Sequence, residues 1–157
     1  WWRPVCGRVY DGRGWKPLPN NLPGEDGWKE MVKPIENRVD TIFVHVTDLH
    51  KSMEWYSRLL GLEIPEGEHN GPIYTFDMGP GRPGLTLDNH CFEPAYAFTP
   101  SNQPLFNLGA TDIEAAYRHV RQLGTEYLSK IVTHPDLAEF TFKDPDGNLL
   151  MVCTCFT

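Results

Sequence analysis

The chain has 157 residues, a formal net charge of −7 and four cysteines. This length suits one domain with a sizeable core, and the acidic balance argues against nucleic acid as the main partner. No apolar run is long enough to cross a membrane and no signal-peptide pattern opens the chain, so we expect a cytoplasmic protein with reduced thiols and no membrane partner.

The first 35 residues differ in composition from the remainder. Four of the five tryptophans lie there among prolines and glycines, and the apolar residues follow neither a helical nor a strand period. We therefore expect an irregular N-terminal extension over residues 1–35, followed by one domain over residues 36–157.

The first periodic segment indicates a strand followed by a helix and a hairpin. Residues 38–46 alternate as a strand with one apolar face. Asp48 is a favourable helix N-cap, an apolar stripe at helical spacing follows it, and Gly61 ends the predicted helix. A hairpin is then expected over residues 74–88. The apolar face of the strand must pack under the helix, so the opposite face points away from it and carries Thr41, Phe43 and His45.

The second half of the chain repeats this order. A strand over residues 105–110 precedes a helix from Asp112 to Gly124, and residues 139–153 form a hairpin around an Asp-Pro-Asp-Gly turn. A unit that occurs twice predicts two matching modules, at residues 38–91 and 104–155, that share a core. The predicted fold class is α+β.

The repeat resembles the vicinal oxygen chelate superfamily, which includes glyoxalase I, extradiol dioxygenases and bleomycin-binding proteins. The resemblance covers about Arg38 to Cys155 and is carried by the turn Asp144-Pro-Asp-Gly-Asn148 and by the helix-start motif Val46-Thr-Asp48. It implies two βαβββ modules whose paired, curled mixed sheets enclose a cavity, with helices outside. It also implies a homodimer, since open sheet edges in this family usually pair with a second chain.

Members of this family that are enzymes hold one divalent metal through four side chains. The resemblance places these positions at Thr41, Thr86, Leu105 and Met151, none of which is a usual ligand for such a cation. We therefore expect neither the family metal nor another cofactor. The alternative is a shifted site for Zn, Ni, Mn or Fe, built from His45, Asp88, His90 and Cys153.

Strand alternation predicts the wall of a ligand-binding cavity. The wall is mixed and combines apolar residues with a few polar groups, as is typical of small-molecule sites, and it carries no predicted Lys or Arg. His45 and Asp88 are the candidate catalytic residues, because a histidine paired with a carboxylate suits general-base chemistry; the alternative is a histidine hydrogen-bonded at the rim. The predicted ligand-binding residues are Thr41, Phe43, His45, Thr86, Asp88, His90, Leu105, Asn107, Met151 and Cys153.

Two function classes follow from this wall. The first is a metal-free protein that binds and sequesters a small, partly aromatic ligand. The second is a glyoxalase-like lyase or isomerase, or a dioxygenase, that acts through a metal at shifted ligands or without metal through His45. A structural module without a ligand is a third possibility if large side chains fill the cavity.

Overall fold

The structure, a computed structural model, describes residues 8–10, 15–17, 35–67 and 69–155. The chain divides into two compact units, Trp1–Val39 and Asp40–Thr157. In the first unit, β1 (Arg8–Tyr10) and β2 (Trp15–Pro17) pair as antiparallel strands. The expected irregular extension therefore contains a short hairpin, because three-residue strands are too short for alternation to reveal them. Trp1, Trp2 and Trp28 lie outside the described residues.

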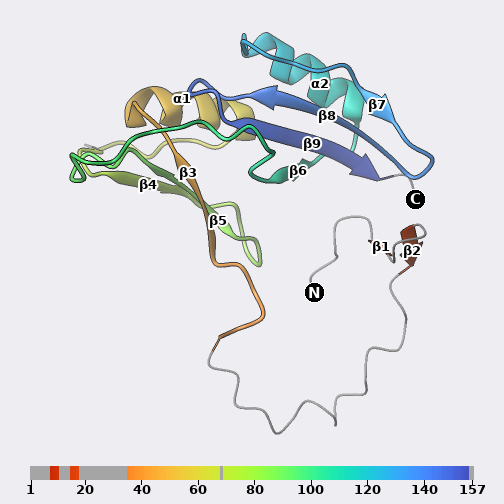
Figure 1. Cartoon of the computed structure of the whole chain (residues 1–157), viewed down its shortest axis with the longest axis horizontal. Helices are drawn as coiled ribbons and strands as arrows, with labels where there is room; N and C mark the ends of the chain where they lie inside the picture. Colours follow the sequence, from red (N-terminus) through yellow and green to blue (C-terminus); the bar gives the residue numbers. More distant parts are fainter. Residues whose placement is uncertain (1–7, 11–14, 18–34, 68, 156–157) are drawn as a thin grey trace, which may run out of the picture. The chain divides into compact units, whose positions relative to one another are not determined.

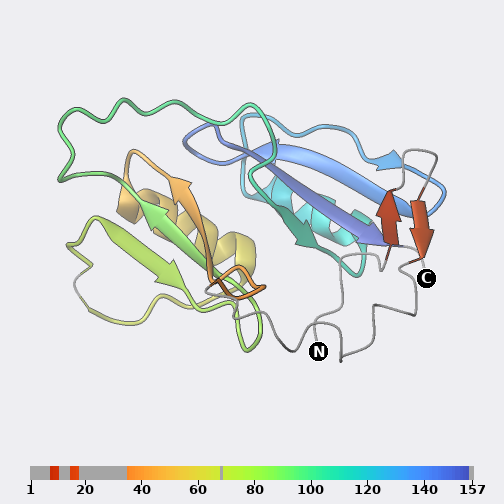
Figure 2. The ribbon, with the colours of Figure 1, turned by 60° about the horizontal axis from the view of Figure 1, so that its bottom comes forward.

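The first module of the second unit consists of β3 (Thr41–His45), α1 (Leu49–Leu60), β4 (Ile73–Phe76) and β5 (Gly84–Asp88). The strand order is β3-β5-β4. Figure 2 shows β3 and β5 side by side and pointing the same way, with β4 running in the opposite direction along β5. Among the described residues between α1 and β4 there is no strand, so this module has one strand fewer than the predicted βαβββ unit.

Local sequence determines both ends of α1. The side chain of the N-cap, Asp48, accepts a hydrogen bond from the backbone N of Lys51. Gly61 ends the helix in the left-handed conformation, with a φ of 66°, which glycine adopts without steric cost. The inner face of the helix packs on β4 and β5 and buries Met53 and Tyr56.

The second module has the complete predicted order. It consists of β6 (Asn107–Gly109), α2 (Ile113–Gln122), β7 (Val132–Thr133), β8 (Leu137–Lys143) and β9 (Leu149–Cys155). The strand order is β6-β9-β8-β7, with β6 parallel to β9 and the remaining pairs antiparallel. Figure 1 shows each helix covering one side of the sheet of its own module, which confirms the predicted α+β class.

The two modules share one hydrophobic core. Phe140, Phe142, Leu150 and Val152 point inward from the predicted second hairpin, and the same cluster contains α1 of the first module. The ring of Phe142 lies 6.2 Å from that of Trp55, centroid to centroid, so aromatic packing crosses the module boundary.

The Asp-Pro-Asp-Gly-Asn turn also joins the modules. Oδ1 of Asp146 accepts hydrogen bonds from the backbone N and the hydroxyl of Thr47, and its Oδ2 accepts one from the hydroxyl of Ser52 at 2.9 Å. The side-chain amide of Asn148 donates to the backbone oxygen of His45 at 3.0 Å. The turn therefore holds the end of β3 and the start of α1 as well as closing its own hairpin.

Two remaining expectations concern the membrane and the thiols. Within the part of the chain that the structure describes, neither helix is long and apolar enough to cross a membrane. Cys91 and Cys153 are free thiols. Cys155 is disulfide-bonded, so the expectation of reduced thiols is wrong at this residue.

Candidate functional site

The sheet β3-β5-β4 has one face under α1 and one open face. Along β3 the side chain of Val44 is fully buried, whereas that of its neighbour Phe43 is 50% exposed. The register pairs Phe43 with Thr86 and His45 with Asp88, and residues paired across strands share a face. We call this surface the open face; it carries Thr41, Phe43, His45, Ile73, Thr75, Gly84, Thr86 and Asp88.

Threonine hydroxyls occupy the family metal positions of the first module. The hydroxyls of Thr75 and Thr86 lie 2.8 Å apart, as do those of Thr86 and Thr41, and the Thr41 hydroxyl donates to the backbone oxygen of Gly84 at 3.1 Å. One proton order satisfies the whole chain, in which Thr75 donates to Thr86, Thr86 to Thr41 and Thr41 to the carbonyl. Neutral hydroxyls with satisfied hydrogen bonds are poor ligands for a divalent cation.

The corresponding positions of the second module are apolar. Leu105 precedes β6 and is 38% exposed, and Met151 lies on β9 opposite Asn107. Neither provides an oxygen or nitrogen ligand. The residues at the four family positions therefore do not fit the metal that this family uses.

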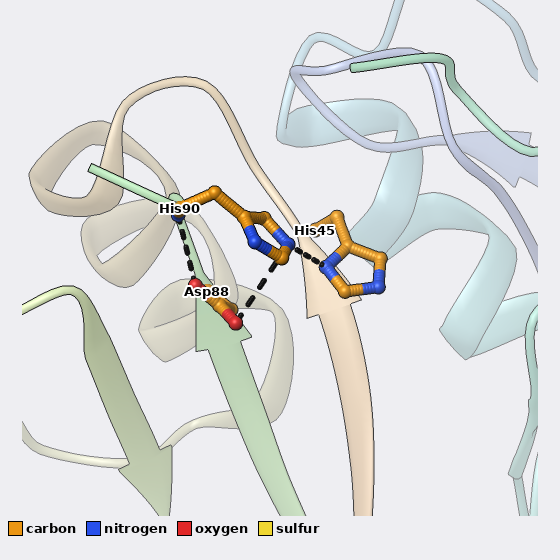
Figure 3. A group of neighbouring side chains, drawn as sticks. All are labelled: His45, Asp88 and His90. Atoms are coloured by element: carbon orange, nitrogen blue, oxygen red, sulfur yellow. Dashed lines mark hydrogen bonds and ion pairs between the residues drawn. The ribbon is translucent and has the colours of Figure 1, made fainter. Parts of the chain in front are cut away.

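Three other predicted site residues come together at the end of β3 and β5. Nδ1 of His45 lies 2.6 Å from Nε2 of His90, and Nε2 of His90 lies 3.7 Å from Oδ2 of Asp88. Figure 3 shows the two imidazoles facing one another with the carboxylate beside them. One potential ligand atom from each residue lies within 4.8 Å of the others. We call these three residues the His-Asp-His cluster.

His90 reaches the cluster from beyond the end of β5, and not as a residue of the extended strand as predicted. It has a φ of 52°, a left-handed conformation that costs a non-glycine residue roughly 1–3 kcal/mol unless its surroundings compensate. Oδ1 of Asp88 accepts a hydrogen bond from the backbone N of His90 at 2.8 Å, and Oε1 of Glu93 lies 3.0 Å from its Nδ1. The ring of Tyr96 stacks on the His90 ring at 3.6 Å with an interplanar angle of 17°.

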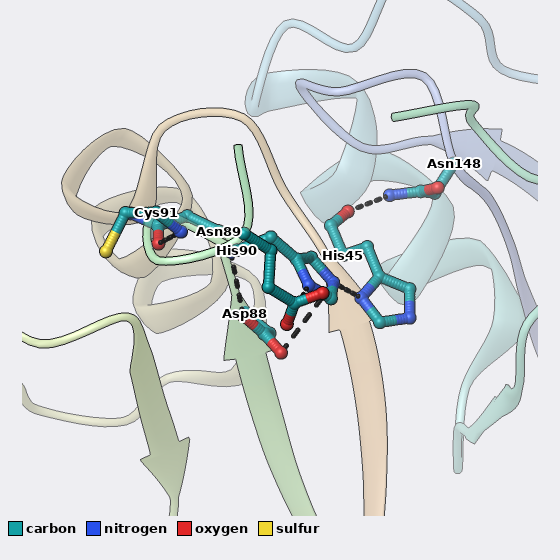
Figure 4. Close-up of polar contacts among 7 residues, drawn as sticks. His45, Asp88, Asn89, His90, Cys91 and Asn148 are labelled. Atoms are coloured by element: carbon teal, nitrogen blue, oxygen red, sulfur yellow. Dashed lines mark hydrogen bonds and ion pairs between the residues drawn. The ribbon is translucent and has the colours of Figure 1, made fainter. Parts of the chain in front are cut away.

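The backbone of His45 is held from the other module. Figure 4 shows the side-chain amide of Asn148 directed at the backbone oxygen of His45. The imidazole of His45 itself stays partly exposed. The cluster is thus fixed on three sides by β3, β5 and the turn of the second module.

Cys153 lies outside this cluster. Its Sγ lies 2.8 Å from Nδ2 of Asn107, and both residues lie on the sheet β6-β9-β8-β7. Oδ1 of Asn107 is buried and has no hydrogen-bond partner among the described residues. The predicted wall is therefore divided between two sheets. Leu105, Asn107, Met151 and Cys153 belong to the second module, and the other six predicted residues belong to the first.

The predicted wall was incomplete on β8 and in the loop after β5. Glu139, Thr141 and Lys143 pair with Cys153, Met151 and Leu149 of β9 and therefore share their face. The inward alternation of Phe140 and Phe142 could have revealed these three residues. Lys143 corrects the expectation that the wall carries no cation. Glu93 and Tyr96 lie in an irregular loop, where strand alternation gives no signal.

A sequence profile identifies the family. The profile described as "Glyoxalase/Bleomycin resistance protein/Dioxygenase superfamily" matches residues 38–152. A search of the curated proteins found no match.

Solved structures share the fold at low sequence identity. A glyoxalase/bleomycin resistance protein/dioxygenase from Nocardioides is 21% identical with a TM-score of 0.60, covering 83% of this chain and 91% of its own. TnmS3, an antibiotic binding protein from Streptomyces sp. CB03234, is 20% identical with a TM-score of 0.59, covering 79% and 99%. Lactoylglutathione lyase from Agrobacterium tumefaciens is 20% identical with a TM-score of 0.56, covering 78% and 96%.

The paired modules, the closing Asp-Pro-Asp-Gly-Asn turn and the profile match over residues 38–152 show that this chain belongs to the glyoxalase/bleomycin resistance protein/dioxygenase superfamily.

Proposed function

We propose that this protein binds and sequesters a small, partly aromatic ligand on the open face, without the metal that enzymes of the family use. The proposal rests on the contrast between the threonines of that face and the neighbouring Phe43. The threonine hydroxyls at the family metal positions bond one another, whereas the adjacent Phe43 presents half of its surface to solvent.

The chemistry of the open face supports a planar ligand. Phe43 and Ile73 are both about half exposed and offer apolar contact, and a phenylalanine ring stacks well on another ring. His45 and Asp88 lie at one end of the same face and can orient polar groups of the ligand. Apolar surface beside a few convergent polar groups is the usual composition of a small-molecule site, and the open face combines Phe43 and Ile73 with His45 and Asp88 in this way.

The second module provides the remainder of the proposed site. The buried Oδ1 of Asn107 has no partner among the described residues, and an unpaired buried acceptor is stabilised when a ligand donates to it. Leu105 and Met151 would add apolar contact, and the thiol of Cys153 fixes the Asn107 amide.

The second candidate function is a glyoxalase-like enzyme, and the position of His45 favours it. Nδ1 of His45 is engaged by His90, so its Nε2 is available as a general base or acid toward a bound molecule. An isomerase or lyase activity that is lost in His45→Ala and retained in His50→Ala would support this candidate over sequestration.

A homodimer and a cytoplasmic location are also proposals. The edge strand β4 carries the half-exposed Ile73, and such edges are commonly covered by a second chain. The free thiols of Cys91 and Cys153 suit a reducing compartment, whereas the disulfide at Cys155 does not.

A thermal-shift screen tests the main proposal. Aromatic, neutral polar and multiply charged anionic compounds are screened in EDTA against the wild type, Phe43→Ala and the control Tyr127→Ala, whose tyrosine is 45% exposed. We expect aromatic hits that stabilise the wild type and Tyr127→Ala but stabilise Phe43→Ala much less. Hits that are mostly multiply charged anions, or hits that stabilise all three proteins equally, would contradict the proposal.

A further inference from the structure

We propose that the His-Asp-His cluster is a binding site for a divalent transition metal of the Zn²⁺ class, at a place different from the family metal positions. The proposal goes beyond ligand sequestration, and it depends on the convergence of Nδ1 of His45, Nε2 of His90 and Oδ2 of Asp88.

The position separates this site from the family site. On β3, His45 lies four residues beyond Thr41, which corresponds to about 13 Å along a strand. On β5, Asp88 lies two residues beyond Thr86. Both shifts are even numbers of residues, so the cluster stays on the open face and moves to its end.

The contact between the two imidazoles is what a metal would replace. The two nitrogens lie 2.6 Å apart, so at most one of them carries a proton and the other presents its lone pair. A cation in place of that proton would receive lone pairs from both rings and from the nearby carboxylate. Two nitrogens bound to Zn²⁺ at about 2.0–2.1 Å in tetrahedral geometry are about 3.3 Å apart. The rings need to separate by less than 1 Å to reach that spacing.

The surroundings of His90 prepare it as a ligand. Oε1 of Glu93 lies 3.0 Å from Nδ1 of His90, and a carboxylate at that nitrogen favours the tautomer whose Nε2 is free to bind a metal. Tyr96 stacks on the ring and Asp88 holds the backbone N, so the orientation of the imidazole is determined on both sides. The side chains of His90 and Asp88 are only 11% and 17% exposed, which limits competition from water.

The ligand types define the class of metal. Two imidazoles and one carboxylate suit Zn²⁺, Ni²⁺, Co²⁺ or Fe²⁺ better than Mg²⁺ or Ca²⁺, which prefer oxygen ligands. No thiolate is part of the set, because Cys153 contacts Asn107. Three protein ligands leave at least one coordination position for water or for a polar group of a bound molecule.

The test uses the full chain without an affinity tag, stripped with EDTA and dialysed. Zn²⁺ is titrated calorimetrically, and Co²⁺ is titrated with its visible absorption bands as an independent report of coordination. We expect one equivalent of either ion in the wild type and the same in His50→Ala, whose histidine is an exposed residue of α1. His45→Ala and His90→Ala should each lower the affinity at least about tenfold and change the Co²⁺ bands.

Asp88→Asn serves as the conservative variant. It removes the negative charge but keeps an oxygen that can accept from the backbone N of His90, so the loop should stay in place and only the metal affinity should fall. Thermal unfolding without metal verifies that each variant is folded. Sub-stoichiometric binding by the folded wild type, or an affinity for Zn²⁺ that is the same in His90→Ala and His50→Ala, would overturn the proposal. Because no organic ligand is involved, this outcome is independent of the screen that tests sequestration.

Discussion

The phenol of Tyr56 donates a 2.8 Å hydrogen bond to Oδ2 of Asp144, and this bond joins α1 of the first module to the turn of the second. Both side chains are buried, at 0% and 3% exposure. Oδ1 of Asp144 accepts from the backbone N of Asp146 and of Asn148, so the carboxylate organises its own turn and the contact between modules.

Tyr56→Phe should destabilise the protein by about 1–3 kcal/mol, because it removes a donor from a buried charged acceptor. Burial already raises the pKa of Asp144, against the opposing effect of its hydrogen bonds from Asn148 and Tyr56. The raised pKa means that charged Asp144 costs stability at neutral pH and that this cost disappears as pH falls through its folded pKa toward the unfolded value. The loss in Tyr56→Phe should therefore be larger at about pH 8 than at about pH 4 in urea unfolding. An equal loss at both values would contradict a charged Asp144 as the partner.

The pKa of Tyr56 is itself raised well above its usual value, first by burial and then by Asp144. The unfolded chain loses the phenolic proton before the folded chain does, so stability should fall as pH rises above about 10. Tyr56→Phe should lack this contribution. A smaller alkaline loss of stability in the variant than in the wild type is the expected result, and identical alkaline slopes would show that Tyr56 does not keep its proton.

Asp146→Ala should weaken the contact between the first module and the turn of the second. The substitution removes the acceptor for Thr47 and Ser52, and we expect a loss of about 1–3 kcal/mol in the free energy of unfolding. Asp146→Asn keeps one oxygen acceptor and should lose less. Hydrogen exchange at the start of α1 should accelerate in Asp146→Ala; faster exchange confined to the β8-β9 hairpin would place the role of Asp146 in its own turn alone.

Met151→Glu should not create metal binding at the family positions, because Thr41, Thr86 and Leu105 remain without ligand atoms for a divalent cation. The experiment is done in a His90→Ala background, so that the His-Asp-His cluster does not contribute. Equilibrium dialysis against Zn²⁺ should find the double variant no better than His90→Ala alone. One additional equivalent would show that the family site needs fewer ligands than we infer.

The homodimer is tested by light scattering after size-exclusion chromatography. We expect a dimer for the wild type and dissociation toward monomer for Ile73→Lys, which places a charge on the half-exposed edge strand β4. Glu114→Lys on the exposed side of α2 is the control. A monomeric wild type, or a dimer that both variants retain, would contradict a dimer interface at β4.

The sequence predicts the second module more fully than the first. The capping residues Asp48 and Asp112, with the inward alternation of Phe140 and Phe142, predict both helices and the β8-β9 hairpin as they are found. The strand that the βαβββ unit places between α1 and β4 is not found among the described residues, because the alternation of Leu62 and Ile64 ends at Pro65 and the residues that follow are mostly polar or glycine.

Strand alternation predicts some residues of the candidate site and misses others. Alternation places Thr41, Phe43 and His45 on the face away from α1, because strand geometry dictates it. Alternation fails for His90, whose left-handed backbone turns the side chain back toward β3. Glu93 and Tyr96, which hold that side chain, lie in an irregular loop, so no periodic sequence pattern predicts them.

An NMR titration of the ¹⁵N-labelled chain in EDTA with the strongest aromatic hit from the screen locates the ligand directly. We expect saturable chemical-shift changes that centre on β3 and β5 around Phe43 and Thr86, with binding at least about tenfold weaker in Phe43→Ala and unchanged in Tyr127→Ala. Shifts that centre on the outer faces of α1 and α2, or binding that appears only after a divalent metal is added, would contradict a metal-free ligand site on the open face.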